Sequence, residues 1–439
     1  MKKYWFVGLF SIVFGVMGDV LAGDMGATLK DNTPNSGFTI KEGTTNSTVA
    51  RFRGDGNVGI GTANPSAKLD IAGNVAINGT PVIDSTGKWV GDSTGLVGPQ
   101  GPQGPQAKYG GVAVVAKSGG DYTDPVAAMA GIAVWGGTPS PSNPCLLKIM
   151  PGVYDIGTNS LVMQPYVDIE GAGETVTKIT GTTSSVGYPI SNGVVQGASN
   201  AEIKSLTVEN TGTGSYNAAI YNGNGAAPKI THVTAISVGG NTYNCGIFNN
   251  NSAPYIAYTT VKVSDGASNY GIDSHNSSSP DLFDVKIDVS GGNVAVGVAE
   301  NSSTYAIANS RIYASGSPDN RGIYSVKSAG ALIRNSMIHA SGGTNNHGVY
   351  TSEATLTMAS VWLYAAGGTG LNYGVNTHGS GIIRIDSSVT RGNSRTISNN
   401  LGVTTNFGSS KLEGGNWFNA GVIHCVGCYD ENYDPIANQ

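Results

Sequence analysis

The sequence predicts an all-β protein whose main body is a parallel β-helix of about ten coils. Two observations lead to this fold class. A unit of 25–27 residues recurs through the second half of the chain. Glycine is abundant at 65 residues, while only 12% of the residues are charged. Internal repeats of this length are typical of solenoids, in which each unit packs only on its neighbours.

The composition is compatible with a folded core and argues against a nucleic-acid-binding protein. Hydrophobic residues make up 39% of the chain, which is too many for general disorder. The formal net charge is -5 and the sequence has no cluster of basic residues, whereas nucleic-acid binding requires a basic surface. We therefore expect no nucleic-acid partner.

Residues 1–22 have the layout of a secretory signal peptide. Two lysines precede an apolar run over residues 4–17, and a Val-Leu-Ala cleavage site ends at Ala22. A membrane anchor is the alternative, but the run is short for a bilayer and Gly18-Asp19 interrupts it. We expect a bacterial protein that is secreted or displayed on the cell surface, without a membrane span after cleavage.

Residues 23–94 form a first region that we expect to be a β-rich stalk. Between residues 52 and 83, short apolar runs alternate with Asp-Gly, Ala-Asn-Pro and Gly-Asn turn signals. The segment GNVGIGTANPSAKLDI (56–71) resembles a segment of phage tail fibres and of bacterial surface proteins built like them. This resemblance implies a trimer, because such segments usually form trimeric shafts.

Residues 95–106, GLVGPQGPQGPQ, place glycine at every third position, with proline after three of the four glycines. Collagen has this pattern because only glycine fits at the common axis of its three chains. Four triplets cannot hold a triple helix alone, and a Pro-Gly-Gln linker is the alternative. Next to a trimeric stalk, we interpret the run as a short stiff joint, and we predict a homotrimer through residues 23–107.

The β-helix body is assigned to residues 107–415 and is expected to open with a capping helix. Asp124 and Pro125 are a typical N-cap and first helical residue. The apolar residues that follow at helical spacing are Val126, Met129, Ala130 and Val134. A short amphipathic helix of this kind would cover the open end of a stack of strands.

Residues 145–181 resemble the opening of the pectinesterase and pectate-lyase superfamily. There, a strand ending in Pro-Gly-x-Tyr is followed by a strand ending in Gly-x-Gly. The matching positions are Pro151, Gly152, Tyr154, Gly171 and Gly173. The resemblance implies the fold of that superfamily more strongly than its activity.

Two columns of apolar residues keep one period through the body. The first is a small residue followed by Ile or Val, at Gly193-Val194, Ala219-Ile220, Gly246-Ile247, Gly271-Ile272, Gly297-Val298, Gly322-Ile323, Gly348-Val349 and Gly374-Val375. The second contains Ile236, Val261, Ile287, Ile312, Ile338, Leu363 and Val389. Two columns in phase over so many repeats predict stacked coils.

The composition of the repeat selects the kind of solenoid. Glycine, serine and asparagine at this density exclude helical repeats, and no leucine ladder is present. The order of Gly-Ile, a short polar stretch, an apolar residue and a further Ile resembles the parallel β-helix repeat family. That resemblance implies right-handed coiling, in agreement with the usual hand of parallel crossovers.

The motifs of β-helix enzymes are absent from the sequence. It contains neither the Asn-Thr-Asp and Gly-His-Gly motifs of polygalacturonases nor the Asp-Phe-Ile-Phe-Gly motif of pectinesterases, and its six histidines are scattered. Asp281, Asp284 and Asp288, with Arg311 one coil later, come nearest to the calcium-binding cluster of pectate lyases. We expect a solvated face there, with Ca²⁺ as the alternative. We assign no catalytic residue, metal ligand or cofactor.

Aromatic side chains are the best candidates for ligand binding. The residue after each apolar column alternates outward and is often aromatic. The candidate residues are Tyr313, His339 and Tyr364 in one outward column, and Tyr324 and Tyr350 in the other. Flat rings with a polar edge suit sugar rings. Stabilisation of the fold by stacked rings is the alternative.

Residues 416–439 follow the last repeat and are expected to form a cap or tail. Trp417 and Phe418 could cover the last coil, with a secretion or anchoring signal as the alternative. Cys425 and Cys428 predict a local disulfide in an exported protein, with thiols or a redox or metal role as alternatives. A zinc site would require a second cysteine pair.

The expected function is adhesive or glycan-binding, with a polysaccharide or a cell-surface glycan as the partner. A polysaccharide lyase or another carbohydrate-active enzyme, such as a glycoside hydrolase, is the alternative. The fold is shared by both classes and does not decide between them. The missing catalytic motifs favour binding without catalysis.

Overall fold

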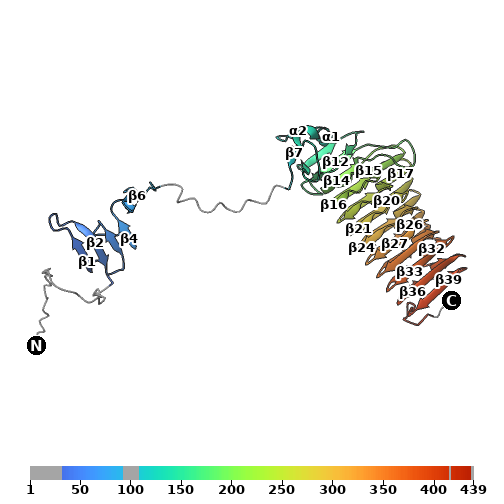
Figure 1. Ribbon diagram of the computed structural model, residues 1–439. Coiled ribbons are helices and arrows are strands. Elements are labelled where there is room, and N and C mark those ends of the chain that lie inside the picture. The colour runs from blue at the N-terminus through green and yellow to red at the C-terminus, as the bar shows by residue number, and fades with distance from the viewer. Residues whose placement is uncertain (1–31, 92–107, 415–416, 437–439) are drawn as a thin grey trace, which may run out of the picture. The chain divides into compact units, whose positions relative to one another are not determined.

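The computed structural model describes residues 32–91, 108–414 and 417–436 (Figure 1). The predicted signal peptide and the collagen-like run lie outside the described residues, so both stay predictions. The chain divides into two compact units, with the boundary between Gln106 and Ala107. Among the described residues, no helix is long and apolar enough to cross a membrane.

The first unit, described over residues 32–91, is β-rich as expected. Its strands are β1 (Gly37–Lys41), β2 (Thr48–Arg53), β3 (Val58–Ile60), β4 (Leu69–Ile71), β5 (Val75–Ile77) and β6 (Thr80–Ile83). Strands β1 to β4 form one sheet in chain order, in which β3 and β4 run parallel and the other neighbours antiparallel. Strands β5 and β6 form an antiparallel hairpin.

The second unit is the predicted parallel β-helix, with about ten turns over its described residues (Figure 1). In the described part of this unit, a 22-stranded sheet bends along one corner into two faces, which we name S1 and S2. An 11-stranded sheet forms the third face, S3. Each turn passes through S3, S1 and S2 in that order, so residues one turn apart lie side by side on neighbouring strands.

The strands of each face follow in stacking order. S1 contains β7 (Gly111–Val115), β8 (Cys145–Ile149), β11 (Val167–Glu170), the first halves of β14 (Glu202–Asn210) and β16 (Lys229–Ser237), β18 (Tyr255–Ala257), β21 (Asp281–Phe283), β24 (Ala306–Ala308), β27 (Ala329–Arg334), β30 (Thr355–Ala359), β33 (Gly381–Asp386), β36 (Val403–Gly408) and β39 (Val422–Val426). S2 contains β9 (Gly152–Asp155), β12 (Thr177–Gly181), the second halves of β14 and β16, β19 (Thr260–Val263), β22 (Lys286–Ser290), β25 (Arg311–Ser315), β28 (Met337–Ser341), β31 (Trp362–Ala366), β34 (Val389–Gly392) and β37 (Lys411–Gly414). S3 contains β10 (Leu161–Val162), β13 (Val195–Gln196), β15 (Tyr216–Gly223), β17 (Tyr243–Asn250), β20 (Ser268–His275), β23 (Val294–Asn301), β26 (Asp319–Val326), β29 (Asn345–Ser352), β32 (Asn372–His378), β35 (Arg395–Asn399) and β38 (Phe418–Asn419).

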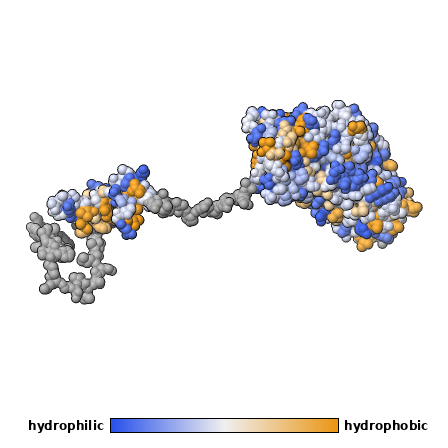
Figure 2. All heavy atoms as spheres, turned by 45° about the horizontal axis from the view of Figure 1, so that its top comes forward, coloured by the Kyte–Doolittle hydropathy of each residue, from blue (hydrophilic) through white to orange (hydrophobic). Residues whose placement is uncertain are grey.

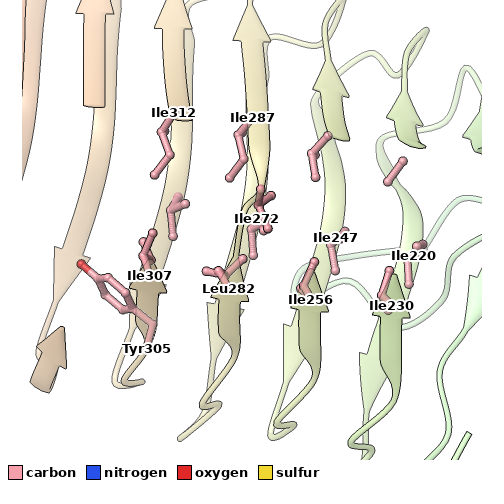
Figure 3. Packing of buried hydrophobic residues seen from close by; sticks show 14 of the residues in the cluster. Ile220, Ile230, Ile247, Ile256, Ile272, Leu282, Ile287, Tyr305, Ile307 and Ile312 are labelled. Atoms are coloured by element: carbon pink, nitrogen blue, oxygen red, sulfur yellow. The ribbon is translucent and has the colours of Figure 1, made fainter. Parts of the chain in front are cut away.

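Apolar side chains fill the interior in columns that run along the β-helix (Figure 3). In S3, Ile220, Ile247 and Ile272 occupy matching positions on successive strands. Ile230 and Ile256 do the same in S1. All five are fully buried, and burial of such a side chain contributes roughly 1.5–3 kcal/mol. The stacking of coils therefore follows from the same residues that create the repeat in the sequence.

The glycine before each S3 isoleucine is required by close packing. A Cβ atom at Gly271 would overlap Ile287 Cγ2 from S2 and the carbonyl oxygen of Gly297 on the next turn. Gly322 has the same relation to Ile338 and to the following turn. The small residue of the first column thus lets S3 approach S2.

From β18 onward, the corner between S1 and S2 is two residues long, and the first of the two is in the left-handed region. Asp284 has a φ of 52°, and Asn309 and Asn335 occupy the same corner on the next turns with φ values of 55° and 48°. Asparagine and aspartate tolerate this conformation better than most residues. On the turn after Asp284, Ser310 Oγ accepts a hydrogen bond from the Val285 amide at 3.1 Å, which satisfies a backbone donor in the corner.

The second apolar column is confirmed in its centre and wrong at both ends. Val261, Ile287, Ile312, Ile338 and Leu363 are aligned and buried in S2. At the ends, the aligned inward residues are Ala235 and Thr390, while Ile236 and Val389 face outward and are half-buried. An apolar residue can lie on the outer side of a strand, so apolarity alone misplaced the two end positions by one residue.

The predicted capping helix is present as two short helices, α1 (Pro125–Ala130) and α2 (Ile132–Trp135). Asp124 caps α1, because its Oδ1 accepts a hydrogen bond from a first-turn amide. The residues that join the core are Ala128, Met129 and Ile132. Val134, expected on the buried side, is 88% exposed, since the helix is interrupted at Gly131 and the helical spacing does not continue through it.

Candidate active site

The outer side of S3 carries a cluster of ionisable and aromatic side chains. Tyr188, Tyr243, Asp273 and His275 form this group, which we name the Tyr–His–Asp cluster. It borders a pocket of about 170 Å³. The pocket is lined by Tyr188, Tyr243, Tyr270, Asp273, His275, Ala299, Glu300, Asn301 and Tyr324.

Strand β20 places two members of the cluster by simple alternation. Ile272 and Ser274 point into the β-helix and are buried, so Asp273 and His275 between and after them point outward. Tyr243 lies one turn earlier, at the start of β17. Asp273 is nevertheless only 2% exposed, because neighbouring aromatic rings cover it.

The fourth member, Tyr188, comes from the loop that joins β12 to β13. Its ring centroid lies 5.6 Å from that of Tyr243, 6.2 Å from that of Phe248 and 5.4 Å from that of His275. The loop therefore extends along the outer side of S3 and forms one wall of the pocket.

The hydrogen bonds in the cluster meet at the imidazole of His275. Its Nε2 lies 2.5 Å from Tyr188 Oη and 3.0 Å from Asp273 Oδ1. Tyr243 Oη donates a short hydrogen bond to Asp273 Oδ2. The carboxylate thus orients the imidazole, and the imidazole contacts a phenol, in a chain of three groups that can exchange protons.

The electrostatics of the pocket keep its phenols protonated. Burial raises the pKa of Tyr188 and of Tyr243, and the negative charge of Asp273 raises both further. The same two causes raise the pKa of Tyr270, whose ring stacks on that of Tyr243 with centroids 4.4 Å apart. At neutral pH these tyrosines are therefore protonated and can donate hydrogen bonds.

A cationic group lies further along the same face. Arg321 and Tyr270 belong to the same outward column, two turns apart. The Arg321 guanidinium lies 4.6 Å from the ring centroids of both Tyr324 and Tyr350, and it pairs with Asp319 at 2.5 Å. Arginine in this environment offers donors and positive charge to a ligand that lies across several strands.

The five aromatic residues predicted from the sequence lie on two faces. On S2, Tyr313, His339 and Tyr364 are aligned, with the His339 ring 6.0 Å and 4.7 Å from its two neighbours. On S3, Tyr324 and Tyr350 are aligned, with ring centroids 5.5 Å apart. Only Tyr324 of the five lines the pocket described above. The predicted alignment of both columns is correct, and their role in ligand binding stays a prediction.

The other candidate sites stay apart from the cluster. Asp281 lies on S1, Asp284 at the corner and Asp288 on S2, where Asp288 pairs with Lys286 at 2.8 Å. Among the described residues, no three histidine, cysteine, aspartate or glutamate side chains are grouped so that they could hold a metal ion.

The two C-terminal cysteines are buried in the last turn, both as thiols. The hydrogen bond from Cys425 lowers the pKa of Cys428 to about 7, and burial together with that bond raises the pKa of Cys425. The two sulfur groups interact directly, and the disulfide between them stays a prediction.

Sequence spacing did not indicate the Tyr–His–Asp cluster. His275 and Tyr188 are separated by 87 positions, and their contact depends on the course of a loop. One signal was present in the outward positions of a single strand, where Asp273 and His275 follow Tyr270 across the close-packed Gly271. Three proton-exchanging residue types on one face of one coil indicate a candidate site.

The comparisons with known proteins agree on the architecture. The sequence matches no known family and no curated protein. The structure is similar to the A-module of mannuronan C-5 epimerase AlgE6 from Azotobacter vinelandii, with a TM-score of 0.52, 14% identity, and coverage of 71% of this chain and 94% of that one. It also matches the A-module of mannuronan C-5 epimerase AlgE4 from the same organism, with a TM-score of 0.42 and 13% identity, covering 71% and 93% of the two chains. A further match is the Dettilon tailspike protein, with a TM-score of 0.42 and 15% identity, covering 70% and 68%. At 14% identity, the match to the AlgE6 module shows the fold alone, a parallel β-helix.

Proposed function

We propose that this protein acts on an acidic polysaccharide by proton transfer at the Tyr–His–Asp cluster. One observation carries the proposal: a protonated phenol and a carboxylate both contact the same imidazole nitrogen in a pocket on the outer side of S3. Such a set supplies a base, an acid and a group that orients the base. This corresponds to the carbohydrate-active alternative of the sequence analysis.

Uronic acid residues offer a reaction that suits this set. In our proposal, His275 Nε2 carries the proton that is donated to Asp273, and Nδ1 accepts the proton from C5, the carbon next to the carboxylate of the sugar. The C–H bond breaks and its electron pair moves toward that carboxylate. Asp273 stabilises the imidazolium that forms, as a carboxylate does for a histidine base.

Two outcomes are open to the intermediate. A protonated tyrosine, Tyr188 or Tyr270, can return a proton to C5 from the other side, which inverts that carbon. Alternatively, the bond between C4 and its glycosidic oxygen breaks, a double bond forms between C4 and C5, and the phenol protonates the leaving oxygen. Because their pKa is raised, both phenols stay protonated at neutral pH, so each has a proton to donate. The name of the similar epimerase module is consistent with the first outcome.

The geometry of S3 supports a chain-like substrate. Neighbouring strands are ~4.8 Å apart, a spacing comparable with the length of one sugar ring. Aromatic rings line the pocket, among them Tyr188, Tyr270 and Tyr324. Arg321 would contact the carboxylate of a neighbouring uronate.

The experiment measures proton exchange at C5. The purified protein is incubated in D₂O with polymannuronate or with polygalacturonate. Proton NMR follows deuterium incorporation and inversion at C5, and ultraviolet absorbance follows unsaturated products. The variant His275→Gln is expected to lower the rate by about 10²–10⁴-fold, the usual contribution of a general base.

A matched control separates the site from the fold. His424 is exposed on β39, and His424→Gln is expected to leave the rate unchanged. Absence of deuterium incorporation and of unsaturated product with both polymers would contradict the proposal. An unchanged rate in His275→Gln would contradict the assigned base.

Glycan binding without catalysis is the second candidate function, and one observation favours it. The row of Tyr313, His339 and Tyr364 on S2 is partly exposed and lies on a different face from the Tyr–His–Asp cluster. An adhesive protein of the cell surface would use such a row to hold a glycan. We propose the row as a separate binding surface, with its test given below.

A further inference from the structure

We infer that one face of the β1–β4 sheet is a self-association surface that joins three copies of this chain. The register places apolar residues opposite one another: Phe38 faces Phe52 between β1 and β2, and Val58 faces Leu69 between β3 and β4. Because side chains alternate along a strand, the aligned apolar residues share one side of the sheet. We name this side the apolar face; it contains Phe38, Ile40, Ala50, Phe52, Val58, Ile60, Leu69 and Ile71.

The apolar face is largely uncovered within the chain. Leu69 is 59% exposed, Phe38 55% and Phe52 44%. Figure 2 shows apolar residues gathered on the described part of this unit. Exposed apolar area costs about 25 cal/mol per Å² relative to burial, and a connected apolar patch on a soluble protein marks an interaction surface.

The opposite side of the same sheet carries charged and polar residues, and some of them pair with one another. Arg51 donates a hydrogen bond to Thr39 Oγ1 at 3.2 Å. Arg53 pairs with Asp55 at 2.5 Å. The sheet is therefore amphipathic, and the apolar face is the side that lacks a covering layer.

The unit does not supply a cover from its own described residues. On the apolar face Ala50 alone is buried, so this side of the sheet has no internal core. A small sheet with one apolar side is stable only when another layer covers that side. A further copy of the same sheet offers a surface of matching size and chemistry.

The chain also indicates how many copies assemble. This unit is followed in the sequence by residues 95–106, in which glycine recurs at every third position and is followed by proline. That pattern fits three parallel chains, since only glycine fits at their shared axis. Three identical apolar faces around a threefold axis satisfy both observations with one closed symmetry.

The experiment measures the mass of the purified protein in solution by light scattering, at several concentrations. The parent protein is expected to have three times the mass of one chain. The double variant Phe38→Ser with Phe52→Ser is expected to show a threefold lower mass. Leu69→Asp, on another strand of the same face, is expected to have the same effect.

The control is Thr39→Ser, at a position that pairs with Arg51 on the opposite side of the sheet, and it should remain trimeric. Thermal unfolding followed by circular dichroism reports separately on the β-helix, which these substitutions do not touch and should leave intact. A single-chain or dimeric parent would overturn the inference, as would a double variant that stays trimeric. The result is independent of the proposed activity, because the Tyr–His–Asp cluster belongs to the other unit.

Discussion

Glu300 is an unfavourably placed ionisable residue inside the β-helix. It is 1% exposed, and neither carboxylate oxygen has a hydrogen-bond partner among the described residues. Burial raises its pKa well above the ordinary value, and the charge of Asp273 adds to the increase. The folded protein therefore holds this group protonated at pH values where the unfolded chain ionises it.

This difference predicts how stability depends on pH. The folded-state pKa is raised, so the contribution of Glu300 is fully present below the unfolded pKa and is lost as pH rises toward the folded value. Below about pH 4, the difference in the free energy of unfolding between the parent and Glu300→Gln should not change with pH. Above that pH, the free energy of unfolding of the parent should fall relative to that of the variant by up to about 1.4 kcal/mol per pH unit. Chemical denaturation at pH 4, 6 and 8 measures the difference.

A matched variant tests whether the effect belongs to burial. Glu353 is exposed at the corner between S3 and S1, and Glu353→Gln should change stability equally at the three pH values. If the stability of Glu300→Gln relative to the parent also does not rise with pH, the prediction is wrong. The Glu300 carboxyl would then be hydrogen-bonded or solvated in the folded protein.

At the scale of the strand, the sequence period predicted more of the structure than the residue types did. Outward columns such as Tyr324 and Tyr350 could be aligned because one coil length repeats. The ends of the second column could not be aligned in this way, because the polar Thr390 points inward and the apolar Val389 points outward. The interior tolerates a hydroxyl near the last turns, and sequence alone does not show where.

In the candidate site, residues on strands could be predicted from the sequence and residues on loops could not. Alternation along β20 directs Asp273 outward, beside the pocket on that side. Tyr188 could not be placed, because a loop has no period and its course depends on packing against rings such as Phe248. Residues on strands are predictable from a repeat, whereas the partners that loops bring to them are not.

The aromatic row on S2 makes a prediction at this scale. Tyr313→Ala with Tyr364→Ala should weaken binding to a glycan array by roughly tenfold, since each ring contact contributes about 0.5–1.5 kcal/mol. Tyr255→Ala, an exposed tyrosine on S1, is the control. Unchanged binding by the double variant, with an intact circular dichroism spectrum, would show that the row serves the fold alone.

The whole β-helix depends on its ends, because each turn is stabilised only by its neighbours. The first turns are covered by α1 and α2, whose residues join the core. At the other end, Cys425 and Cys428 belong to the core, with Trp417 and Ile436 packed against it. An end that opens would expose the strand edge of the next turn.

The cysteine pair predicts a redox effect on this end. Oxidation with glutathione disulfide should join the two sulfur atoms and raise stability by about 2 kcal/mol, as expected for closure of a very short loop. The measurement is thermal unfolding with and without dithiothreitol. Cys425→Ser with Cys428→Ser should remove the difference, whereas an unmodified parent that shows no response to the oxidant would contradict it.

From β18 onward, the short corner between S1 and S2 limits where a turn can vary in length. An insertion at Asp284 or Asn335 would disturb a two-residue connection whose first residue has a left-handed backbone. Longer connections occur at the other two corners, both of which border S3, and in the first turns at residues 171–176 between β11 and β12. Changes in the length of the loops beside S3 can therefore alter the pocket there while the strands of S1 and S2 keep their alignment. The loop that carries Tyr188 is one such loop.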